Sequence, residues 1–396
     1  MDFYKGYLCK VYPPAFHQFI ETNLQANTAQ LALKAKVHPE FDVREALEQI
    51  HCLQKAKTKL PTWYKNRCLF TRRALEQATA EEVALFKAQL FKGSLLYDLT
   101  GGLGVDNWAF AQSFEQVIGV DSDEELNQLV RYNFERIKQT NIQRIEAQAE
   151  AYIQAIEPNS VVYVDPDRRD GSRRKLLLEE CSPNVLDMLP GLQAKGCTLL
   201  LKLSPLFEPT EVERSIQGVS QIFAIALQNE LKELLVVVMP HSQASVQRIS
   251  VNITPFGIQQ FAGGTQVNLP SKSGHGLWFF EPNVALIKLK LWKTFANSQG
   301  LETIHPEIPY LIGKEAIPAF QGRQFTVLAK VEGGLKQMQL YLKERGIEKV
   351  NLAERNAGMG VAEIRKQLKV KDGGEDYLFF LKSAQGKLLG IHGRKG

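Results

Sequence analysis

Between residues 93 and 239, short apolar runs alternate with segments of helical periodicity, and this alternation constrains the fold more than any other feature. Several runs are apolar throughout, which is typical of strands covered by helices on both faces. Alternating strands and helices predict a doubly wound, Rossmann-like α/β sheet. Seven strands are expected, at residues 95–98, 116–121, 142–146, 160–165, 198–203, 221–227 and 234–239. The last two should form an antiparallel hairpin, because too few residues join them for a parallel crossover.

The sequence on either side of this sheet has a different character. Residues 1–91 are rich in Ala, Leu, Gln, Glu and Lys and predict an N-terminal helical region before the sheet domain at 92–240. Residues 241–324 predict a strand at 246–254 and a helix at 282–296 and suggest a small middle α+β domain. Residues 325–396 predict strand, helix (335–345), strand (350–353), helix (361–368) and a terminal hairpin, which is a second small α+β domain.

Composition excludes several classes of protein. Hydrophobic residues make up 44% and charged residues 23%, as in an ordinary folded soluble protein. The N-terminus lacks a basic and apolar leader, and no run of about 18 apolar residues occurs, so a cytoplasmic protein without membrane spans is expected. The five cysteines lack C-x-x-C spacing and the seven histidines lack paired ligand spacing, which favours reduced thiols and no metal site.

A glycine-rich turn, Asp-Leu-Thr-Gly-Gly-Leu-Gly-Val-Asp at residues 98–106, follows the first strand. Such a turn between strand and helix lets a nucleotide cofactor approach the backbone, although an ordinary strand-to-helix turn is the alternative. The dinucleotide pattern G-x-G-x-x-G fails here, because Asn107 stands where the third glycine would be. Asp98 would sit poorly beside a pyrophosphate, but it could accept hydrogen bonds from the amino group of a methionine moiety. Asp121, at the end of the second strand, could accept from both hydroxyls of a ribose.

A further acid ends the fourth strand, in the sequence Val-Tyr-Val-Asp165-Pro-Asp-Arg-Arg. The carboxyl edge of a doubly wound sheet, next to the point where the strand order reverses, is where ligands bind. Asp165 is therefore the candidate for chemistry.

These segments resemble class I S-adenosylmethionine-dependent methyltransferases, and more narrowly the bacterial group with a C-terminal THUMP-like domain. The resemblance covers most of the chain. It extends to residues 201–205, to Glu76, Gln77, Glu81 and Lys87 before the sheet, and to residues 351–356, 363–366 and 371–374 of the tail. It implies that the tail, 325–396, is a THUMP-like domain and that the sheet is a methyltransferase sheet.

The resemblance also implies a cofactor and a reaction. S-adenosylmethionine would be held by Asp98, Thr100, Gly101, Gly102, Gly104, Asp121 and Gln148, the last standing where related enzymes have an acid beside the adenine. Asp165 and the Pro166 carbonyl would orient the nucleophile. Arg168 stands where enzymes that methylate amino groups of nucleic acids have an aromatic residue, and its guanidinium plane could stack on a base. The implied activity is methylation of a base of RNA, tRNA or rRNA.

Three basic segments are candidates for RNA contact. Cations interleaved with aromatic residues between positions 55 and 73 suggest a single-strand binding surface that includes Trp63 and Arg67, although a solvated helix face is an equal alternative. Arg169, Arg173 and Arg174 follow Asp165 directly and are expected to contact substrate phosphates. The third segment is the basic tail.

Two alternative functions remain open on the sequence. One is a methyltransferase for a small molecule or a protein. The other is a catalytically inactive methyltransferase fold that binds RNA.

Overall fold

The computed structural model describes residues 12–34, 37–168, 177–240, 242, 244–263, 277–383 and 386–396. The chain divides into two compact units, Met1–Ser220 with Leu235–Ala244 and Gln221–Leu234 with Ser245–Gly396. Among the described residues, no helix is both long and apolar enough to cross a membrane.

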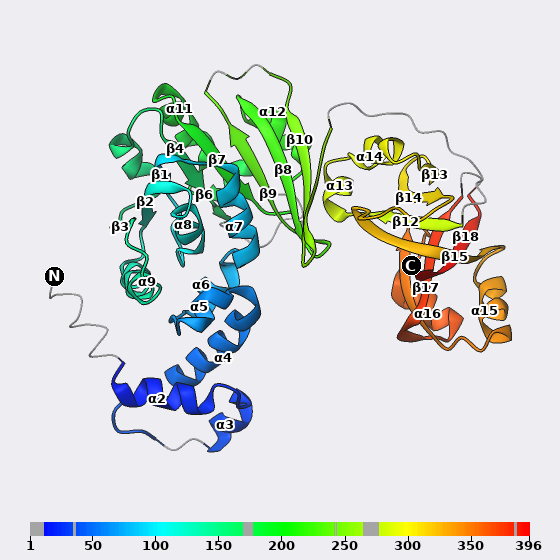
Figure 1. The fold of residues 1–396 in the computed structure, drawn as a ribbon, viewed down its shortest axis with the longest axis horizontal. Helices are drawn as coiled ribbons and strands as arrows, with labels where there is room; N and C mark the ends of the chain where they lie inside the picture. Colours follow the sequence, from blue (N-terminus) through cyan, green and yellow to red (C-terminus); the bar gives the residue numbers. More distant parts are fainter. Residues whose placement is uncertain are drawn as a thin grey trace. The chain divides into compact units, whose positions relative to one another are not determined.

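The predicted N-terminal helical region is present and drawn in blue in Figure 1. Its helices are α2 (Pro14–Asn23), α3 (Thr28–Lys34), α4 (Val43–Lys59), α5 (Pro61–Lys65), α6 (Arg72–Gln77) and α7 (Glu81–Leu90). Asp42 precedes α4, and its side chain accepts a hydrogen bond from the Arg44 backbone N–H, which satisfies one of the donors that a helix start leaves unpaired. The buried face of α4 carries Ile50 and Leu53, as the apolar spacing predicts.

Five parallel strands form one side of the main sheet, in the order β7-β4-β1-β2-β3, with β3 at the edge. Their bounds are β1 Gly93–Asp98, β2 Phe114–Asp121, β3 Ile142–Glu146, β4 Val161–Val164 and β7 Thr198–Leu203. The chain builds outward from β1 to β3 and then returns to the other side of β1 to form β4. The order therefore reverses between β1 and β4, and the carboxyl ends of these two strands carry Asp98 and Asp165.

Helices connect these strands, which confirms the predicted doubly wound architecture. They are α8 (Val105–Phe110), α9 (Glu124–Arg136), α10 (Ala149–Tyr152), α11 (Val185–Ala194) and, after β7, α12 (Pro209–Ser215). A short antiparallel pair, β5 (Asp167–Arg168) and β6 (Cys181–Ser182), lies outside the main sheet.

The sheet continues beyond the seven predicted strands. Strands β8 (Val219–Leu227) and β9 (Glu230–Val238) are joined by Gln228 and Asn229, whose φ angles of 50° and 67° suit the two-residue turn of a hairpin. Strands β10 (Gln247–Thr254) and β11 (Gly257–Gly263) add to this edge and give nine strands in the order β11-β10-β8-β9-β7-β4-β1-β2-β3. The sequence predicted a strand near β10 but not its partner, because alternation of polar and apolar residues does not specify the neighbouring strand.

The suggested middle domain at 241–324 is not one sheet in the structure. Its first strands, β10 and β11, belong to the nine-stranded sheet, whereas β12 (Trp278–Pro282), β13 (Glu302–His305) and β14 (Ile308–Gly313) belong to a seven-stranded sheet with the C-terminal strands. The helix expected over 282–296 is two helices, α13 (Val284–Lys288) and α14 (Trp292–Ser298). Lys290, with a φ of 58°, lies at the break between them.

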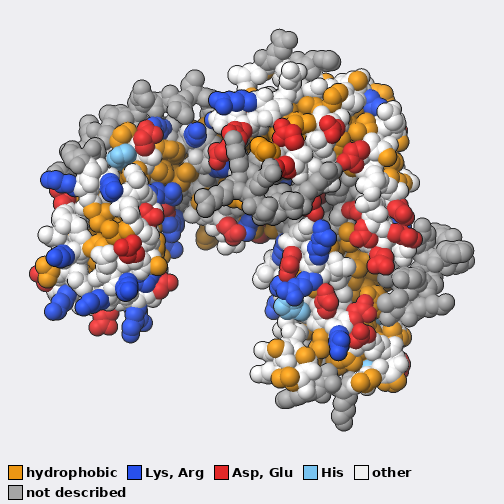
Figure 2. Space-filling view, turned by 180° about the vertical axis from the view of Figure 1, so that it is seen from behind, with side chains coloured by type: hydrophobic (Ala, Val, Ile, Leu, Met, Phe, Trp, Pro, Cys, Tyr) orange, Lys and Arg blue, Asp and Glu red, His pale blue; other side chains and the backbone are white. Residues whose placement is uncertain are grey.

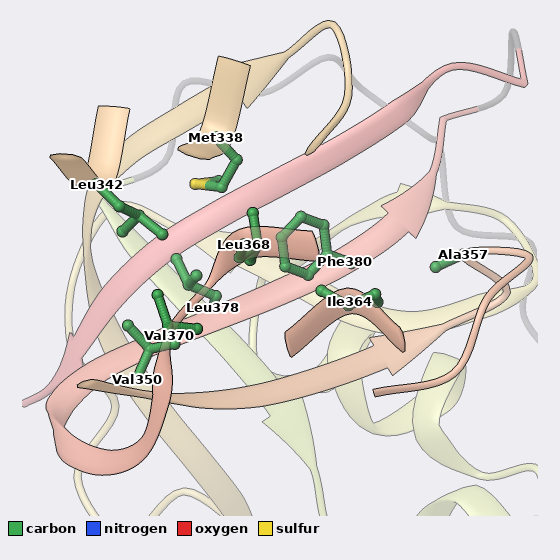
Figure 3. Packing of buried hydrophobic residues seen from close by; sticks show 9 residues of the cluster. All are labelled: Met338, Leu342, Val350, Ala357, Ile364, Leu368, Val370, Leu378 and Phe380. Carbon is green, nitrogen blue, oxygen red and sulfur yellow. The ribbon is translucent and has the colours of Figure 1, made fainter. Parts of the chain in front are cut away.

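The C-terminal region has the predicted order of elements. Strand β15 (Gly322–Glu332) leads to α15 (Leu335–Glu344), β16 (Lys349–Arg355), α16 (Val361–Leu368) and the antiparallel pair β17 (Lys371–Lys382) and β18 (Leu388–Lys395). Figure 3 shows the core that both helices share with the sheet. Met338, Leu342, Ile364 and Leu368 pack from the helices onto a cluster that includes Val350, Leu378 and Phe380.

Candidate active site

A cavity of about 810 Å³ opens at the carboxyl ends of β1, β2 and β4. Its volume lies in the range of small-molecule and cofactor sites. All seven residues expected to contact a cofactor line it, and so does Asp165. The cavity lining consists of residues 98–106, 121–123, 147–150, 165 and 167, with further residues from the helices, among them Arg73, Gln77 and Leu129.

The glycine turn has the backbone geometry that its composition predicts. Gly102 and Gly104 have φ angles of 46° and 82°, which side chains with a Cβ rarely adopt. A Cβ on Gly104 would lie 2.7 Å from the ring carbon Cζ of Phe134 and 2.9 Å from a methyl of Val130, both on α9. Glycine at position 104 is therefore required by conformation and by close packing.

Asp98 is 1% exposed, and hydrogen bonds hold both of its carboxylate oxygens. Oδ1 accepts from the backbone N–H of Thr100 at 2.9 Å and from its hydroxyl at 3.2 Å, and Oδ2 accepts from the Asn107 amide at 2.6 Å. Burial raises the pKa of Asp98 to about 7 in spite of the Thr100 backbone hydrogen bond. A buried carboxyl with this pKa gains its charge readily when a cation binds beside it.

Asp121 holds the glycine turn from the neighbouring strand. Its Oδ2 accepts from the backbone N–H of Gly102 at 2.8 Å, and its Oδ1 accepts from the backbone N–H of Asp123 at 2.9 Å. The carboxylate is thereby fixed at the end of β2 while it lines the cavity.

Asp165 is connected to both sides of the cavity. Its backbone N–H donates to the Thr100 hydroxyl at 2.7 Å, so Thr100 bridges Asp98 and Asp165. Its carboxylate Oδ2 forms an ion pair with the Nζ of Lys202 on β7. The ion pair connects the carboxyl end of β4 to the neighbouring strand β7.

Lys87 of α7 forms a buried ion pair beneath the cavity. Its Nζ lies 2.9 Å from Oδ1 of Asp106 and donates to the Tyr163 hydroxyl at 2.8 Å, and the side chain is 0% exposed. Although burial acts to raise the pKa of Asp106, the charge of Lys87 holds that pKa below its ordinary value. This contact fixes the last helix before the sheet to the helix that follows the glycine turn.

Comparisons with known proteins identify the fold and the C-terminal domain. A crystal structure of a candidate methyltransferase from Porphyromonas gingivalis W83 matches with a TM-score of 0.84 and 24% identity, over 96% of this chain and 98% of that one. A family model described as THUMP domain-like matches residues 322–395. The chain has a methyltransferase fold and a C-terminal THUMP-like domain.

Two curated relatives are also similar to the chain. They are uncharacterized S-adenosylmethionine-dependent methyltransferases from two strains of Mycobacterium tuberculosis, CDC 1551 / Oshkosh and ATCC 25618 / H37Rv. Each is 23% identical over 305 residues, which is 76% of this chain and 81% of the relative.

Helix α6 of the N-terminal region forms part of the wall of the methyltransferase cavity. The Gln77 amide donates to Asp167 Oδ2 at 3.1 Å, and a guanidinium nitrogen of Arg73 lies 3.8 Å from the same oxygen. Asp167 follows Asp165 by two residues, so α6 adjoins the segment that is expected to carry the chemistry. This contact is not predictable from the sequence pattern, because the two residues are 90 positions apart.

The expectation that Trp63 stacks on a nucleic acid base is wrong for this fold. Trp63 is 0% exposed, and its ring lies edge-on to Phe134 at 6.2 Å. Phe70 is buried as well, whereas Tyr64, the third aromatic residue of that segment, is half-buried. Trp63 and Phe70 belong to the core, where their large apolar area is worth most.

Arg67 and its neighbours are engaged within the protein. The Arg67 guanidinium donates to both carboxylate oxygens of Glu21, at 2.6 and 3.2 Å. Lys55 and Arg72 both pair with Glu76, at 3.3 and 3.1 Å. The segment looked strongly basic in the sequence because the acids that neutralise it stand outside it.

Four predicted residues of the catalytic and substrate-binding segment lie wholly or partly outside the described residues. They are Arg169, Arg173 and Arg174, together with the side chain of Arg168. The backbone of Arg168 pairs with Cys181 in the short β5–β6 ladder.

Four cysteines, at positions 52, 68, 181 and 197, are buried and form no disulfide. In the described ranges, no group of three or more His, Cys, Asp or Glu side chains is arranged to hold a metal ion.

Arg144, in the middle of β3, is the residue of the site that sequence reasoning missed. Its guanidinium lies under the glycine turn and donates to the Gly102 carbonyl at 3.0 Å. The available signal was an arginine in the middle of a predicted strand, in the sequence Ile-Gln-Arg-Ile.

Proposed function

We propose that this protein is an S-adenosylmethionine-dependent methyltransferase that methylates a base of RNA, in tRNA or rRNA. The observation that carries the proposal is the convergence of the glycine turn, Asp98, Asp121 and Asp165 on one cavity. The names of the Mycobacterium tuberculosis relatives support the cofactor, and the THUMP-like domain supports RNA by analogy of fold.

The described residues include a candidate contact for each chemical group of the cofactor. Asp98 would accept hydrogen bonds from the ammonium of the methionine moiety, and Asp121 would accept from the ribose hydroxyls. Gln148 lines the cavity at the end of the strand next to β2, where its amide would address the edge of the adenine. Gly102 and Gly104 would let the cofactor approach the backbone. When bound, S-adenosylmethionine supplies a methyl group on a positively charged sulfur.

The protein's own residues would then position the nucleophile. The Asp165 carboxylate and the Pro166 carbonyl would accept hydrogen bonds from an amine of the target base, so that its lone pair faces the methyl group. The ion pair with Lys202 would hold the Asp165 carboxylate in place for this task. Asp165 would also be the nearest acceptor for the proton that the methylated nitrogen must lose.

Binding of the product S-adenosylhomocysteine should weaken as the pH falls below about 7, by about tenfold per pH unit, because a protonated Asp98 cannot pair with the ammonium. Burial raises the pKa of Asp98 to about 7, which sets the midpoint. The same raised pKa means that Asp98 contributes to the stability of the ligand-free protein. This contribution is fully present below the ordinary pKa of aspartate and is lost as the pH rises through about 7. Titration calorimetry across this range measures the effect. Asp98→Asn should remove it, and a pH-independent affinity in the wild type would exclude the role of Asp98.

The charge of the C-terminal unit favours a nucleic acid partner. From Lys330 onward the sequence holds 14 Lys and Arg against 8 Asp and Glu. Figure 2 shows Lys and Arg side chains gathered along the lower edge of the lobe on the left. Exposed cations of this unit include Lys336, Lys343, Lys366, Lys369 and Lys371. Clustered exposed cations bind the phosphates of nucleic acids.

RNA affinity should fall steeply with salt, and charge reversal at Arg173 and Arg174 should reduce the log–log slope by about 0.7 per lost phosphate contact on single strands. Fluorescence anisotropy with labelled RNA at several salt concentrations measures the slope. A matched control is the double reversal of Lys92 and Lys138, which are exposed and precede β1 and β3 at the opposite edge of the sheet. An unchanged slope in the Arg173 and Arg174 variant would assign these residues to a solvated surface. Failure of the wild type to bind RNA at any salt concentration would favour a small-molecule substrate.

A further inference from the structure

We propose that Arg144 is a positioning residue for the cofactor, which sets the glycine turn and the two acids on either side of it through two separate hydrogen-bonded arms. This inference rests on the proposed cofactor and goes beyond it, because Arg144 lies beneath the turn rather than among the cavity-lining residues. Its role would be to hold the glycine turn, Asp98 and Asp121 in fixed positions relative to one another.

The guanidinium is buried and makes one hydrogen bond in each of three directions. Arg144 is 5% exposed. Its Nη2 donates to the Gly102 carbonyl at 3.0 Å, its Nη1 to Asn107 Oδ1 at 2.7 Å, and its Nε to Asn127 Oδ1 at 2.9 Å. A planar guanidinium with fixed donor directions determines the positions of its acceptors more strictly than an ammonium would.

The first arm runs through Asn107 to the acid expected at the amino-acid end of the cofactor. With its Oδ1 held by Arg144, the Asn107 amide directs its Nδ2 at Asp98 Oδ2, 2.6 Å away. Arg144 therefore fixes which way the Asn107 amide faces. That orientation places a donor, rather than a second acceptor, against the buried carboxyl of Asp98.

The second arm runs through Asn127 to the acid expected at the ribose. Asn127 accepts from Arg144, and its Nδ2 donates to the backbone carbonyl of Asp121 at 2.9 Å. The Asp121 carboxylate in turn accepts from the Gly102 N–H. Gly102 is thus held by Arg144 at its carbonyl and by Asp121 at its N–H.

The backbone leaves room for the guanidinium at two glycines. A Cβ on Gly101 would overlap Arg144 Nη1, and a Cβ on Gly119 of β2 would overlap the Asn107 amide and lie 3.1 Å from Arg144 Nη1. The φ angle of Gly101 lies outside the left-handed region, so its backbone conformation does not require glycine. Glycine is required there because a Cβ would occupy the space of the Arg144 guanidinium. Burial lowers the pKa of Arg144 to about 10, and the charges of Asp121 and Asp98 oppose that shift. The guanidinium therefore stays charged at neutral pH.

Two ligands separate the two arms in a binding experiment. S-adenosylhomocysteine carries both the amino-acid and the ribose groups, whereas 5′-methylthioadenosine lacks the amino acid. Calorimetry on the full chain should show that Arg144→Met lowers affinity for both ligands by about 30-fold or more, and that Arg144→Lys restores part of it. Asn107→Ala should lower affinity for S-adenosylhomocysteine by about tenfold or more but leave 5′-methylthioadenosine within about threefold. Asn127→Ala should weaken both.

Arg131→Met is the matched control. Arg131 of α9 donates to the backbone carbonyl of Arg144 at 2.8 Å, so it adjoins the same strand, and it does not line the cavity. Its removal should leave both affinities within about threefold of wild type. The difference between the two ligands in the Asn107 variant is a readout that general destabilisation would not produce. If Arg144→Met does not fold, the Arg144→Lys and asparagine variants carry the test.

The outcomes distinguish the inference from the function on which it rests. A folded Arg144→Met protein that binds both ligands within about threefold of wild type would overturn the inference alone. Equal losses for both ligands in Asn107→Ala would overturn the assignment of two arms. A wild type that does not bind S-adenosylhomocysteine would overturn the cofactor and the inference together. Binding without methyl transfer to RNA would overturn the proposed reaction and leave the inference standing.

Discussion

Replacing Asp165 with alanine is expected to lower the rate of methyl transfer to RNA by about 10²-fold or more while S-adenosylhomocysteine affinity stays within about threefold. Asp165 ends the fourth strand, and its carboxylate pairs with Lys202 rather than with the residues expected to hold the amino acid or the ribose. Its loss should therefore remove orientation of the nucleophile and leave the contacts to the cofactor. Single-turnover transfer of a labelled methyl group measures the rate, and calorimetry measures the affinity.

S-adenosylhomocysteine is the suitable ligand for this comparison because its sulfur is uncharged. The Lys202 ammonium that Asp165→Ala leaves behind would repel the charged sulfur of S-adenosylmethionine and obscure the result. Asp187→Ala removes an exposed acid from the first turn of α11 and serves as the control. Transfer by Asp165→Ala at the wild-type rate would show that the assignment of Asp165 is wrong.

Asp121→Ala should weaken S-adenosylhomocysteine binding by about 1.5 to 3 kcal/mol, the usual range for hydrogen bonds to a charged group. The carboxylate is fixed by the N–H groups of Gly102 and Asp123, so it is already oriented before a ribose arrives. Its removal should also loosen the glycine turn, so the expected loss of binding free energy lies toward the upper end of this range. Calorimetry at constant pH measures the change.

The control for Asp121 lies on the same strand. Glu115 is an exposed acid near the amino end of β2, at the edge of the sheet away from the cavity, and Glu115→Ala should bind the ligand as the wild type does. NAD should not bind, because the turn lacks the third glycine and carries Asp98. Tight binding of NAD without binding of S-adenosylhomocysteine would contradict the class of cofactor.

The strands and the acids at their ends could be predicted because both are local features of the sequence. An apolar run marks a buried strand, and the residue that ends it lies at the carboxyl edge of a parallel sheet. Asp98, Asp121 and Asp165 were found in this way, and the structure brings all three to the same cavity. The bounds predicted for α16 are also those observed.

The missed features depend on partners that are distant in sequence. Lys202 lies in residues 201–205, which resemble the methyltransferase group, but its pairing with Asp165 follows only from the adjacency of β4 and β7. Arg144 lies in a predicted strand but was assigned no role, and only the fold places it beneath a turn that is 42 residues away. Trp63 was misread for the same reason, since the residue that packs against it, Phe134, lies on α9.

The most direct test of the central claim is transfer of a labelled methyl group from S-adenosylmethionine to total RNA. RNA from a strain that lacks this protein should accept label in a saturable reaction, and RNA from the parent strain should accept little because its sites are already methylated. Asp165→Ala should leave both RNA pools unlabelled over the same time. If the wild-type protein binds S-adenosylhomocysteine and RNA yet labels neither pool, the protein is not an RNA methyltransferase.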